Sequence, residues 1–256
     1  MNSKDYRLKA KELLQGKEKP FAIAAIIFYA IAFPISFLSQ LIINYVNDPT
    51  VIMLANTLNF AFSLLITLVL GFGMVIISMK VIRGMDIAAN DIFAGFKRWN
   101  SIVLLNFLKS LYIMLYMLLF IVPGILKSLS YAMSDYILAD NPDMNPGDAL
   151  KKSEEMMKGH RWEYFKLEFS FVGWYILSVF TLGILLLWVV PRNHTAIALF
   201  YEKLKADTYG AEPYYGYTEP FNQPDYNYNT YSQPPFEAEP IQPEINFPTE
   251  ENTIDE

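Results

Sequence analysis

Charged side chains inside otherwise apolar stretches are the first candidates for chemistry in this sequence. An ionisable group inside a membrane-crossing helix is costly, so it is a candidate for function by default. Lys109 lies about 15 residues before the Pro123-Gly124 corner, and Asp135 lies about 11 residues after it. At about 1.5 Å per helical residue, these offsets are about 22 and 16 Å. We therefore predict that Lys109 and Asp135 pair across a helical hairpin.

A second pair of residues has the same offsets with the charges reversed. Glu168 lies 15 residues before Gly183, and His194 lies 11 residues after it, which predicts a Glu168–His194 pair. The other polar residues expected near the two pairs are Asn106, Ser134, Arg192 and Asn193. Together these residues could form a polar cavity for an ion, a proton or a small polar ligand. Alternatively, the pairing could serve only to accommodate polar groups in a helical bundle.

The sequence lacks the groups that most hydrolases and metalloproteins use. It has no Cys and two His, His160 and His194, and it contains no Ser-His-Asp order, HExxH motif, Walker loop or glycine-rich dinucleotide turn. Turn and helix-cap chemistry explains Asp140, Asp143 and Asp148 without a metal. We therefore expect no enzymatic activity, no cofactor and no metal site.

Six apolar segments must position the polar groups. The sequence is 53% hydrophobic, and the apolar segments are residues 21–43, 51–79, 102–122, 125–139, 162–181 and 184–201. About 20 apolar residues in a helix cross a bilayer. The sequence therefore predicts an all-α fold, a polytopic membrane bundle of six transmembrane helices in three hairpins. We expect Pro34 to kink the first helix and residues 191–195 to interrupt the sixth.

The distribution of basic residues decides between this arrangement and an alternative with one long crossing over residues 165–190. With six crossings, sixteen of the 20 basic residues fall in residues 1–20, 80–101, 140–161 and 203–205, and the three opposite connections carry none. Loops rich in Lys and Arg remain on the cytoplasmic side of a membrane. We therefore favour six crossings with both termini in the cytoplasm.

Short amphipathic helices are predicted at the membrane surface, outside the six crossings. Residues 3–15 place Tyr6, Ala10, Leu13 and Leu14 on one face. A second helix begins at Asn145, and its apolar face consists of Ala149, Leu150, Ser153, Met156 and Met157. The Met156-Met157 face could bind a partner protein, but packing at the membrane surface is the preferred interpretation.

A glycine-containing signature precedes three of the predicted crossings. The copies are Leu13-Leu14-Gln15-Gly16-Lys17, Ile92-Phe93-Ala94-Gly95-Phe96-Lys97 and Met156-Met157-Lys158-Gly159-His160-Arg161. In each copy we expect the glycine to end a surface helix and the following base to lie at the membrane edge. We therefore predict that residues 1–205 form a six-helix membrane domain of three repeats that start near residues 3, 86 and 145.

Several short segments resemble a known bacterial family. They are Val122-Pro123-Gly124-Ile125, Leu138-Ala139-Asp140-Asn141-Pro142, Met156-Met157-Lys158-Gly159-His160, Thr181-Leu182-Gly183 and Phe200-Tyr201-Glu202. These segments are similar to the bacterial membrane-protein family catalogued as domain of unknown function 975, which is itself distantly similar to the membrane domain of some glycerophosphodiester phosphodiesterases. The resemblance covers residues 5–205, supports six crossings and implies a place in the bacterial cytoplasmic membrane. It brings no catalytic residues.

Residues 206–256 differ from the rest of the chain. They contain eleven acidic residues, eight Pro and seven Tyr, and no Lys or Arg, which predicts a disordered acidic tail in the cytoplasm. The clusters at residues 214–217 and 226–228 could bind other proteins, or the tail could be a passive spacer.

The expected function follows from this organisation. Lys and Arg near the inner leaflet favour anionic membrane lipids as partners, and the tail could bind other membrane or cytoplasmic proteins. We expect no nucleic-acid partner. A non-enzymatic scaffold or accessory factor is the favoured function, with envelope stress or antimicrobial-peptide tolerance as its setting. The alternative is a transporter for a small solute, an ion or a lipid that uses the polar residues within the membrane.

Overall fold

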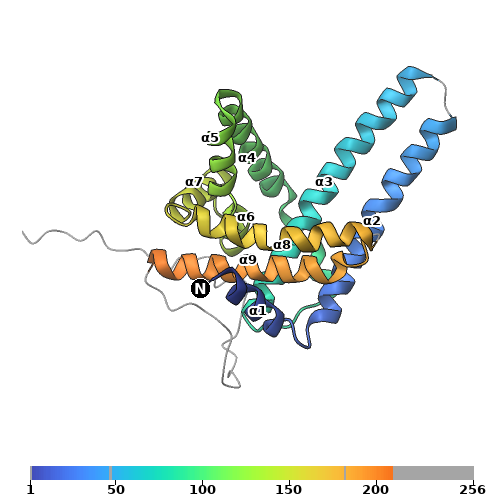
Figure 1. Cartoon of the computed structure of the whole chain (residues 1–256). Helices are drawn as coiled ribbons and strands as arrows, with labels where there is room; N and C mark the ends of the chain where they lie inside the picture. Colours follow the sequence, from blue (N-terminus) through green and yellow to red (C-terminus); the bar gives the residue numbers. More distant parts are fainter. Residues whose placement is uncertain (1, 46–47, 182, 210–256) are drawn as a thin grey trace, which may run out of the picture. The chain divides into compact units, whose positions relative to one another are not determined.

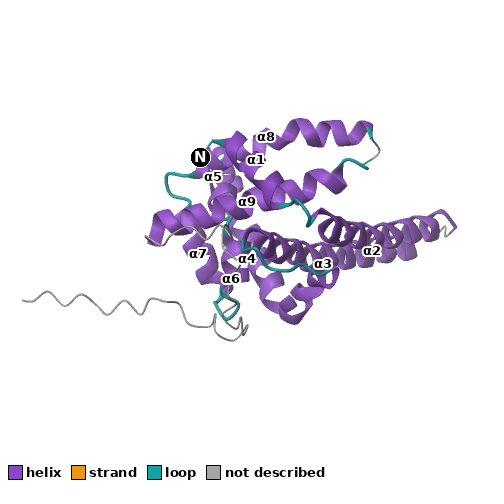
Figure 2. Cartoon of the chain, turned by 90° about the horizontal axis from the view of Figure 1, so that it is seen from below, coloured by secondary structure: helices purple, strands orange, loops and turns teal. Residues whose placement is uncertain are grey.

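The computed structural model describes residues 2–45, 48–181 and 183–209 (Figure 1). These residues form helices joined by turns, with no strand among them, so the predicted all-α class is confirmed (Figure 2). The helices are α1 Ser3–Leu13, α2 Glu18–Tyr45, α3 Pro49–Ile82, the 3₁₀ helix η1 Ala89–Arg98, α4 Trp99–Leu119, α5 Ile121–Ser130, α6 Ser134–Asp140, α7 Pro146–Met156, α8 Arg161–Phe180 and α9 Leu186–Tyr209. Among the described residues, Pro49–Ile82 and Ala89–Leu119 are long and apolar enough to cross a membrane.

Helix α1 has the amphipathic pattern that the sequence predicts, but its apolar face packs against protein. Asn2 caps the first turn, and Asp5 completes a reciprocal capping box. Tyr6 and Ala10 are fully buried in the hydrophobic core, and the Tyr6 ring lies edge-on to Phe200 of α9. The expected contact of this face with the membrane surface is therefore wrong, because α9 covers it.

Helices α2 and α3 lie side by side as an antiparallel hairpin (Figure 1). Asp48 caps α3 by accepting a hydrogen bond from the Thr50 amide at 2.8 Å, and α2 continues through Pro34. The two ends of α3 differ in their surroundings. Large apolar side chains near its start are exposed, whereas most residues from Ile66 to Ile82 are buried in the core.

Two glycines allow η1 to pack directly on the α3 backbone. A Cβ atom on Gly73 would lie 2.0 Å from the Ile92 carbonyl oxygen, and one on Gly95 would lie 2.4 Å from the Val69 carbonyl oxygen. Gly95 therefore serves close packing, and the expectation that it ends a surface helix is wrong.

The other two signature glycines behave as predicted. Gly16 follows α1 with φ 80° and Gly159 follows α7 with φ 85°, a left-handed conformation that ends a helix and favours glycine. The first and third copies of the signature thus share one local structure, and the second does not.

The corner of the second hairpin lies before the Pro123-Gly124 pair. The chain turns at Phe120, which has extended backbone angles, and Pro123 lies in the first turn of α5. Proline is tolerated there because the first amide groups of a helix have no partner within the helix. A Cβ atom on Gly124 would lie 2.2 Å from the Met117 side chain. The glycine therefore allows α5 to approach α4, and the predicted corner was placed too late.

The returning arm of this hairpin is broken between α5 and α6, where the sequence predicts one continuous helix. Ser153 of α7 bridges the break. Its hydroxyl donates to the Ser130 carbonyl oxygen at 2.7 Å and accepts from the Met133 amide at 3.2 Å. One side chain therefore satisfies a backbone group on each side of the interruption.

Helix α7 begins as predicted, with Asn145 as the N-cap and Pro146 in the first turn. Its predicted apolar face is also correct, but it is buried in the core. Met156 and Met157 both pack into the same cluster as Ala149 and Leu150, so this face is not available to a partner protein or to lipid.

Helices α8 and α9 form a third antiparallel pair (Figures 1 and 2). Gly183 has φ 83° at the turn between them, so the alternative of one long helix over residues 165–190 is wrong. Helix α9 runs without a break through Pro191 and continues to Tyr209. The predicted interruption at residues 191–195 is therefore also wrong. The structured chain extends past the predicted boundary at residue 205, and the tyrosine clusters of the tail lie outside the described residues.

The contact between η1 and α3 can be tested with two alanine substitutions in one helix. We expect Gly73→Ala to lower the free energy of unfolding by about 1–3 kcal/mol, because the new methyl group overlaps the η1 backbone. Gly71→Ala is the matched control, since no atom lies within 4 Å of the added Cβ atom. It should be neutral or stabilise the helix by up to about 1 kcal/mol. Thermal unfolding in detergent measures both, and equal melting temperatures would contradict the close contact.

Candidate functional site

The predicted pair between Lys109 and Asp135 is present. Lys109 on α4 lies with its Nζ 2.8 Å from Oδ2 of Asp135 on α6. Both side chains are largely shielded from solvent, with exposed fractions of 21% and 22%. The pair forms although the corner lies at Phe120, so that Lys109 is 11 residues before it and Asp135 is 15 residues after it.

Glu168 and His194 do not form the predicted pair. The Glu168 carboxylate lies beside Asn193 and Tyr164, and the described residues show no ion pair between Glu168 and His194. The offsets from Gly183 fix the distance along a helix but not the rotation about its axis. Neighbouring residues differ by about 100° around a helix, so Asn193 faces Glu168 where His194 was expected.

His194 faces the second hairpin instead. Its carbonyl oxygen accepts a hydrogen bond from the Tyr136 hydroxyl at 3.4 Å, and its ring lies near enough to Asp135 to interact electrostatically. Among the described residues, the buried His194 Nδ1 has no hydrogen-bond partner, whereas the buried Asn193 side chain lies beside the Glu168 carboxylate. Unsatisfied buried polar atoms are uncommon in folded proteins, so this nitrogen marks the cluster as a place where a small polar group could bind.

Three predicted residues remain, and Ser134 donates its hydroxyl to the Tyr131 carbonyl oxygen at 2.7 Å. Asn106 donates its side-chain amide to the Ile102 carbonyl oxygen of its own helix at 2.9 Å. Arg192 lies 3.9 Å from the carboxylate of Glu18 on α2, away from the Lys109–Asp135 pair. The structure therefore brings together a polar cluster, defined as Lys109, Asp135, Tyr136, Glu168, Asn193 and His194, and leaves Asn106 and Arg192 outside it.

A second charged site was missed in the sequence. Arg83 directly follows α3, and its guanidinium contacts the carboxylates of Asp140 at the end of α6 and Glu202 on α9, the latter at 2.7 Å. Lys205 and the Tyr201 hydroxyl bind the other oxygen of Asp140 at 2.6 and 3.1 Å. We call these five residues the arginine network.

Three members of the arginine network are almost entirely buried. The side chains of Arg83, Asp140 and Glu202 are 15%, 4% and 5% exposed. Burial alone would raise the pKa of Asp140, but the charges of Arg83 and Lys205 outweigh it and hold that pKa below its ordinary value. Burial would likewise lower the pKa of Arg83, and the two carboxylates instead raise it. Arg83 and Asp140 are therefore charged at neutral pH.

An aromatic contact joins the arginine network to the polar cluster. The rings of Tyr136 and Tyr201 lie with their centroids 5.8 Å apart. Tyr201 binds Asp140, and Tyr136 binds the His194 carbonyl oxygen. The two polar sites thus form one continuous buried path along α6 and α9.

Comparison with known proteins locates part of this arrangement in a family. Residues 117–208 match the family model described as a protein of unknown function, DUF975. We call these residues, which are similar to that family, the DUF975 segment. No curated protein and no solved structure matches the chain.

The DUF975 segment confirms the family resemblance seen in the short motifs between residues 122 and 202. It includes Asp135, Asp140 and His194, and it extends past Lys205. Arg83 and Lys109 precede it. The matched part of the chain therefore supplies every acidic member of both polar sites, and the preceding part supplies a basic partner to each.

The Asp140 contacts predict a specific pH dependence of stability. The pKa of Asp140 lies below its ordinary value of 3.8 in the folded chain. Its stabilising effect is therefore complete above that pH and is lost as the pH falls through the lowered folded pKa. We expect Asp140→Asn to cost about 3 kcal/mol at neutral pH, because a buried charge loses its partner. The difference from wild type should shrink below about pH 4.

Asp143→Asn is the matched control for this experiment. Asp143 pairs with Arg98 at 3.1 Å, but its side chain is 74% exposed, so its removal should cost less than about 1 kcal/mol. Chemical unfolding in detergent at several pH values measures both variants. A gap between Asp140→Asn and wild type that stays constant down to pH 2 would contradict the role of the Asp140 charge.

Proposed function

We propose that this chain is a multi-pass protein of the bacterial cytoplasmic membrane that acts as a scaffold or accessory factor without catalysis of its own. The observation that carries the proposal is the exposure of large apolar side chains at the far ends of its hairpins. In α3 these include Met53, Leu58 and Phe60, and at the α4–α5 corner Leu118, Phe120 and Ile121. Contiguous apolar surface of this kind is typical of contact with lipid.

The helix Ala89–Leu119 supports contact with lipid most directly. A helix in the core of a water-soluble protein is mostly buried, whereas 11% of the most apolar window of this helix is buried within the protein. Its exposed residues include Phe107, Met114 and Leu118. Exposure of such residues to water would be unfavourable by about 1.5–3 kcal/mol for each side chain that could be buried.

Four crossings in two hairpins, α2–α3 and α4 with α5–α6, are part of the proposal, in place of the six that the sequence predicts. The hairpin α8–α9 would lie along the cytoplasmic surface, because Leu187 and Val190 of α9 pack against the cluster that contains Leu14 and Phe21, at the cytoplasmic start of the first crossing. Arg83, Asp140 and Glu202 stand at or near the ends of the three returning arms, and their mutual contacts are consistent with arms that end on one side of a membrane. This side is also rich in Lys and Arg, which favours the cytoplasm for both termini.

A scaffold is favoured because the buried charges largely satisfy one another. Arg83 binds two carboxylates, and Lys109 binds Asp135. Such pairs hold helices in a fixed arrangement and leave few ionised groups available for chemistry. The tail and the exposed bases would then provide the contacts with other proteins and with lipids. Envelope stress or antimicrobial-peptide tolerance is the proposed setting.

A transporter is the second candidate, favoured by the buried His194 Nδ1, which has no hydrogen-bond partner among the described residues. In that case the polar cluster would bind a small solute, an ion or a lipid headgroup during its passage. Substitutions in the cluster would then abolish function while the protein still inserts normally.

The topology can be tested with single cysteines because the chain has none of its own. We expect a membrane-impermeant thiol reagent, applied to intact cells, to label Asp48→Cys and to spare Asn90→Cys and Lys151→Cys. All three positions are exposed in the structure. Labelling after permeabilisation is the control for reactivity. Labelling of position 90 or 151, but not position 48, in intact cells would refute the proposed orientation.

The two functional candidates are separated by survival of cells under a cationic antimicrobial peptide. A scaffold should lose its protective effect when the chain is truncated after Tyr209 and should keep it in Asp135→Asn, provided that the variant accumulates in the membrane. A transporter should show the opposite pattern. Equal survival of deletion and wild-type cells would refute the proposed setting.

A further inference from the structure

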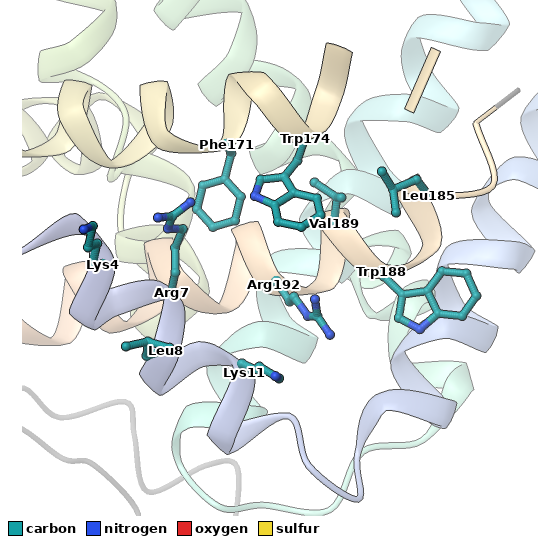
Figure 3. Close-up of a pocket in the computed structure, with 10 residues that line it drawn as sticks. All are labelled: Lys4, Arg7, Leu8, Lys11, Phe171, Trp174, Leu185, Trp188, Val189 and Arg192. Atoms are coloured by element: carbon teal, nitrogen blue, oxygen red, sulfur yellow. The ribbon is translucent and has the colours of Figure 1, made fainter. Parts of the chain in front are cut away.

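A groove between α1, α8 and α9 combines four basic side chains with an apolar wall. Its volume is about 400 Å³, which lies in the range of small-molecule sites. The basic side chains are Lys4, Arg7 and Lys11 of α1 and Arg192 of α9 (Figure 3). The apolar wall consists of Leu8, Phe171, Trp174, Leu185, Trp188 and Val189.

The positive charge of this groove is poorly neutralised by the protein. In the described part of the chain, no ion pair involves Lys4 or Lys11, and Arg7 donates to a neutral acceptor, the Ser170 carbonyl oxygen, at 3.2 Å. Arg192 has one distant carboxylate partner, Glu18, at 3.9 Å. Several cations held close together without matching acids attract an anion, and phosphate suits Arg and Lys particularly well.

A second hollow continues the groove. Its volume is about 260 Å³, and it shares Trp188 and Arg192 with the first. Beyond them it is lined by Glu18 and Lys19 at the start of α2 and by five apolar residues, which are Leu14 directly after α1, Ala22, Ile26, Leu187 and Pro191. The basic groove thus continues past Trp188 into the second, mainly apolar hollow.

We propose that this groove binds one anionic phospholipid, with the phosphate between α1 and α9 and an acyl chain along Trp188 toward Ile26. The proposal rests on the membrane location proposed above. It assigns the preference for anionic lipids, expected from the basic residues, to one defined site. Figure 3 shows Phe171 and Trp174 extending from α8 toward α9, with Arg192 between α9 and α1. Tryptophan commonly occupies the headgroup level of a membrane, so the two indole rings suit an interfacial lipid.

Helix α1 makes the site possible through the packing described for the fold. Because Tyr6 and Ala10 face the core, the adjacent face of α1 presents Arg7 and Lys11, which lie one turn apart, to the groove. The helix therefore forms part of a protein-lined lipid site, where the sequence pattern alone suggested a helix lying freely on the membrane.

The proposal is tested with the full-length protein in nanodiscs that contain equal amounts of phosphatidylglycerol and phosphatidylcholine. We expect native mass spectrometry to detect retained phosphatidylglycerol on wild type. The double variant Lys11→Gln with Arg192→Gln should retain at least about tenfold less, since each base near an anionic lipid contributes measurably to binding. Lys97→Gln with Lys158→Gln is the control, because it removes the same charge from exposed positions outside the groove.

Two further results decide the outcome. Equal retention of phosphatidylglycerol by the groove variant and the control variant would overturn the lipid site. Displacement of the lipid by millimolar glycerol phosphate would also overturn it, because the ligand would then be a soluble phosphate ester. Membrane fractionation and cysteine labelling of the same wild-type protein are recorded separately. A protein absent from the membrane fraction refutes the proposed function, whereas an inserted protein without selective lipid refutes this site alone.

Discussion

The contacts of Arg83 with two carboxylates hold the ends of three hairpins together. A buried guanidinium is tolerated because its five N–H donors can be shared among several acceptors in one plane. Asp140 and Glu202 provide those acceptors, and Lys205 balances the second negative charge. Removal of any one member would leave its partners buried with unmatched charge, which costs several kcal/mol. The charged residues of the arginine network therefore determine which helix ends meet. Apolar packing alone would specify these contacts less precisely.

The same arrangement explains why the hairpins can expose so much apolar surface at their far ends. The buried core and the ion pairs concentrate near the ends where the network lies, and Ser153 supplies the backbone partners that the broken arm between α5 and α6 needs. In lipid, exposed apolar side chains carry no penalty, but an unsatisfied backbone amide does. The structure follows this division, with irregular backbone inside the protein and regular helix facing outward.

The helices could be predicted well because their signals are local. The cap at Asn145 and the turn at Gly183 each act within a few residues, and the structure agrees at both. The pairing of side chains is harder to predict. Lys109 and Asp135 face each other although the corner lies at Phe120, whereas the rotation of α9 turns Asn193, and not His194, toward Glu168.

The arginine network was missed for a different physical reason. Arg83 lies 57 residues from Asp140 and 119 residues from Glu202 in the sequence, and no periodic pattern connects positions so far apart. Arg83 is one of the loop bases that predict the orientation, and no residue near it in the sequence indicates its partners. The motifs Leu138-Ala139-Asp140 and Phe200-Tyr201-Glu202 contain the partners of Arg83. Both motifs lie near the ends of returning arms, and this shared position is the sequence feature that could have indicated the contact.

The order of the network along the chain has a consequence for biogenesis. Arg83 emerges from the ribosome first and Asp140 second, while Glu202 and Lys205 arrive only with α9. Until translation reaches that point, the first two hairpins can pack through α3, α4 and α6 and form the Arg83–Asp140 contact, but the arginine lacks its second acceptor. Final assembly of the bundle must therefore wait for the synthesis of α9, so a product that ends before it would present its charges to the quality-control proteases of the cell.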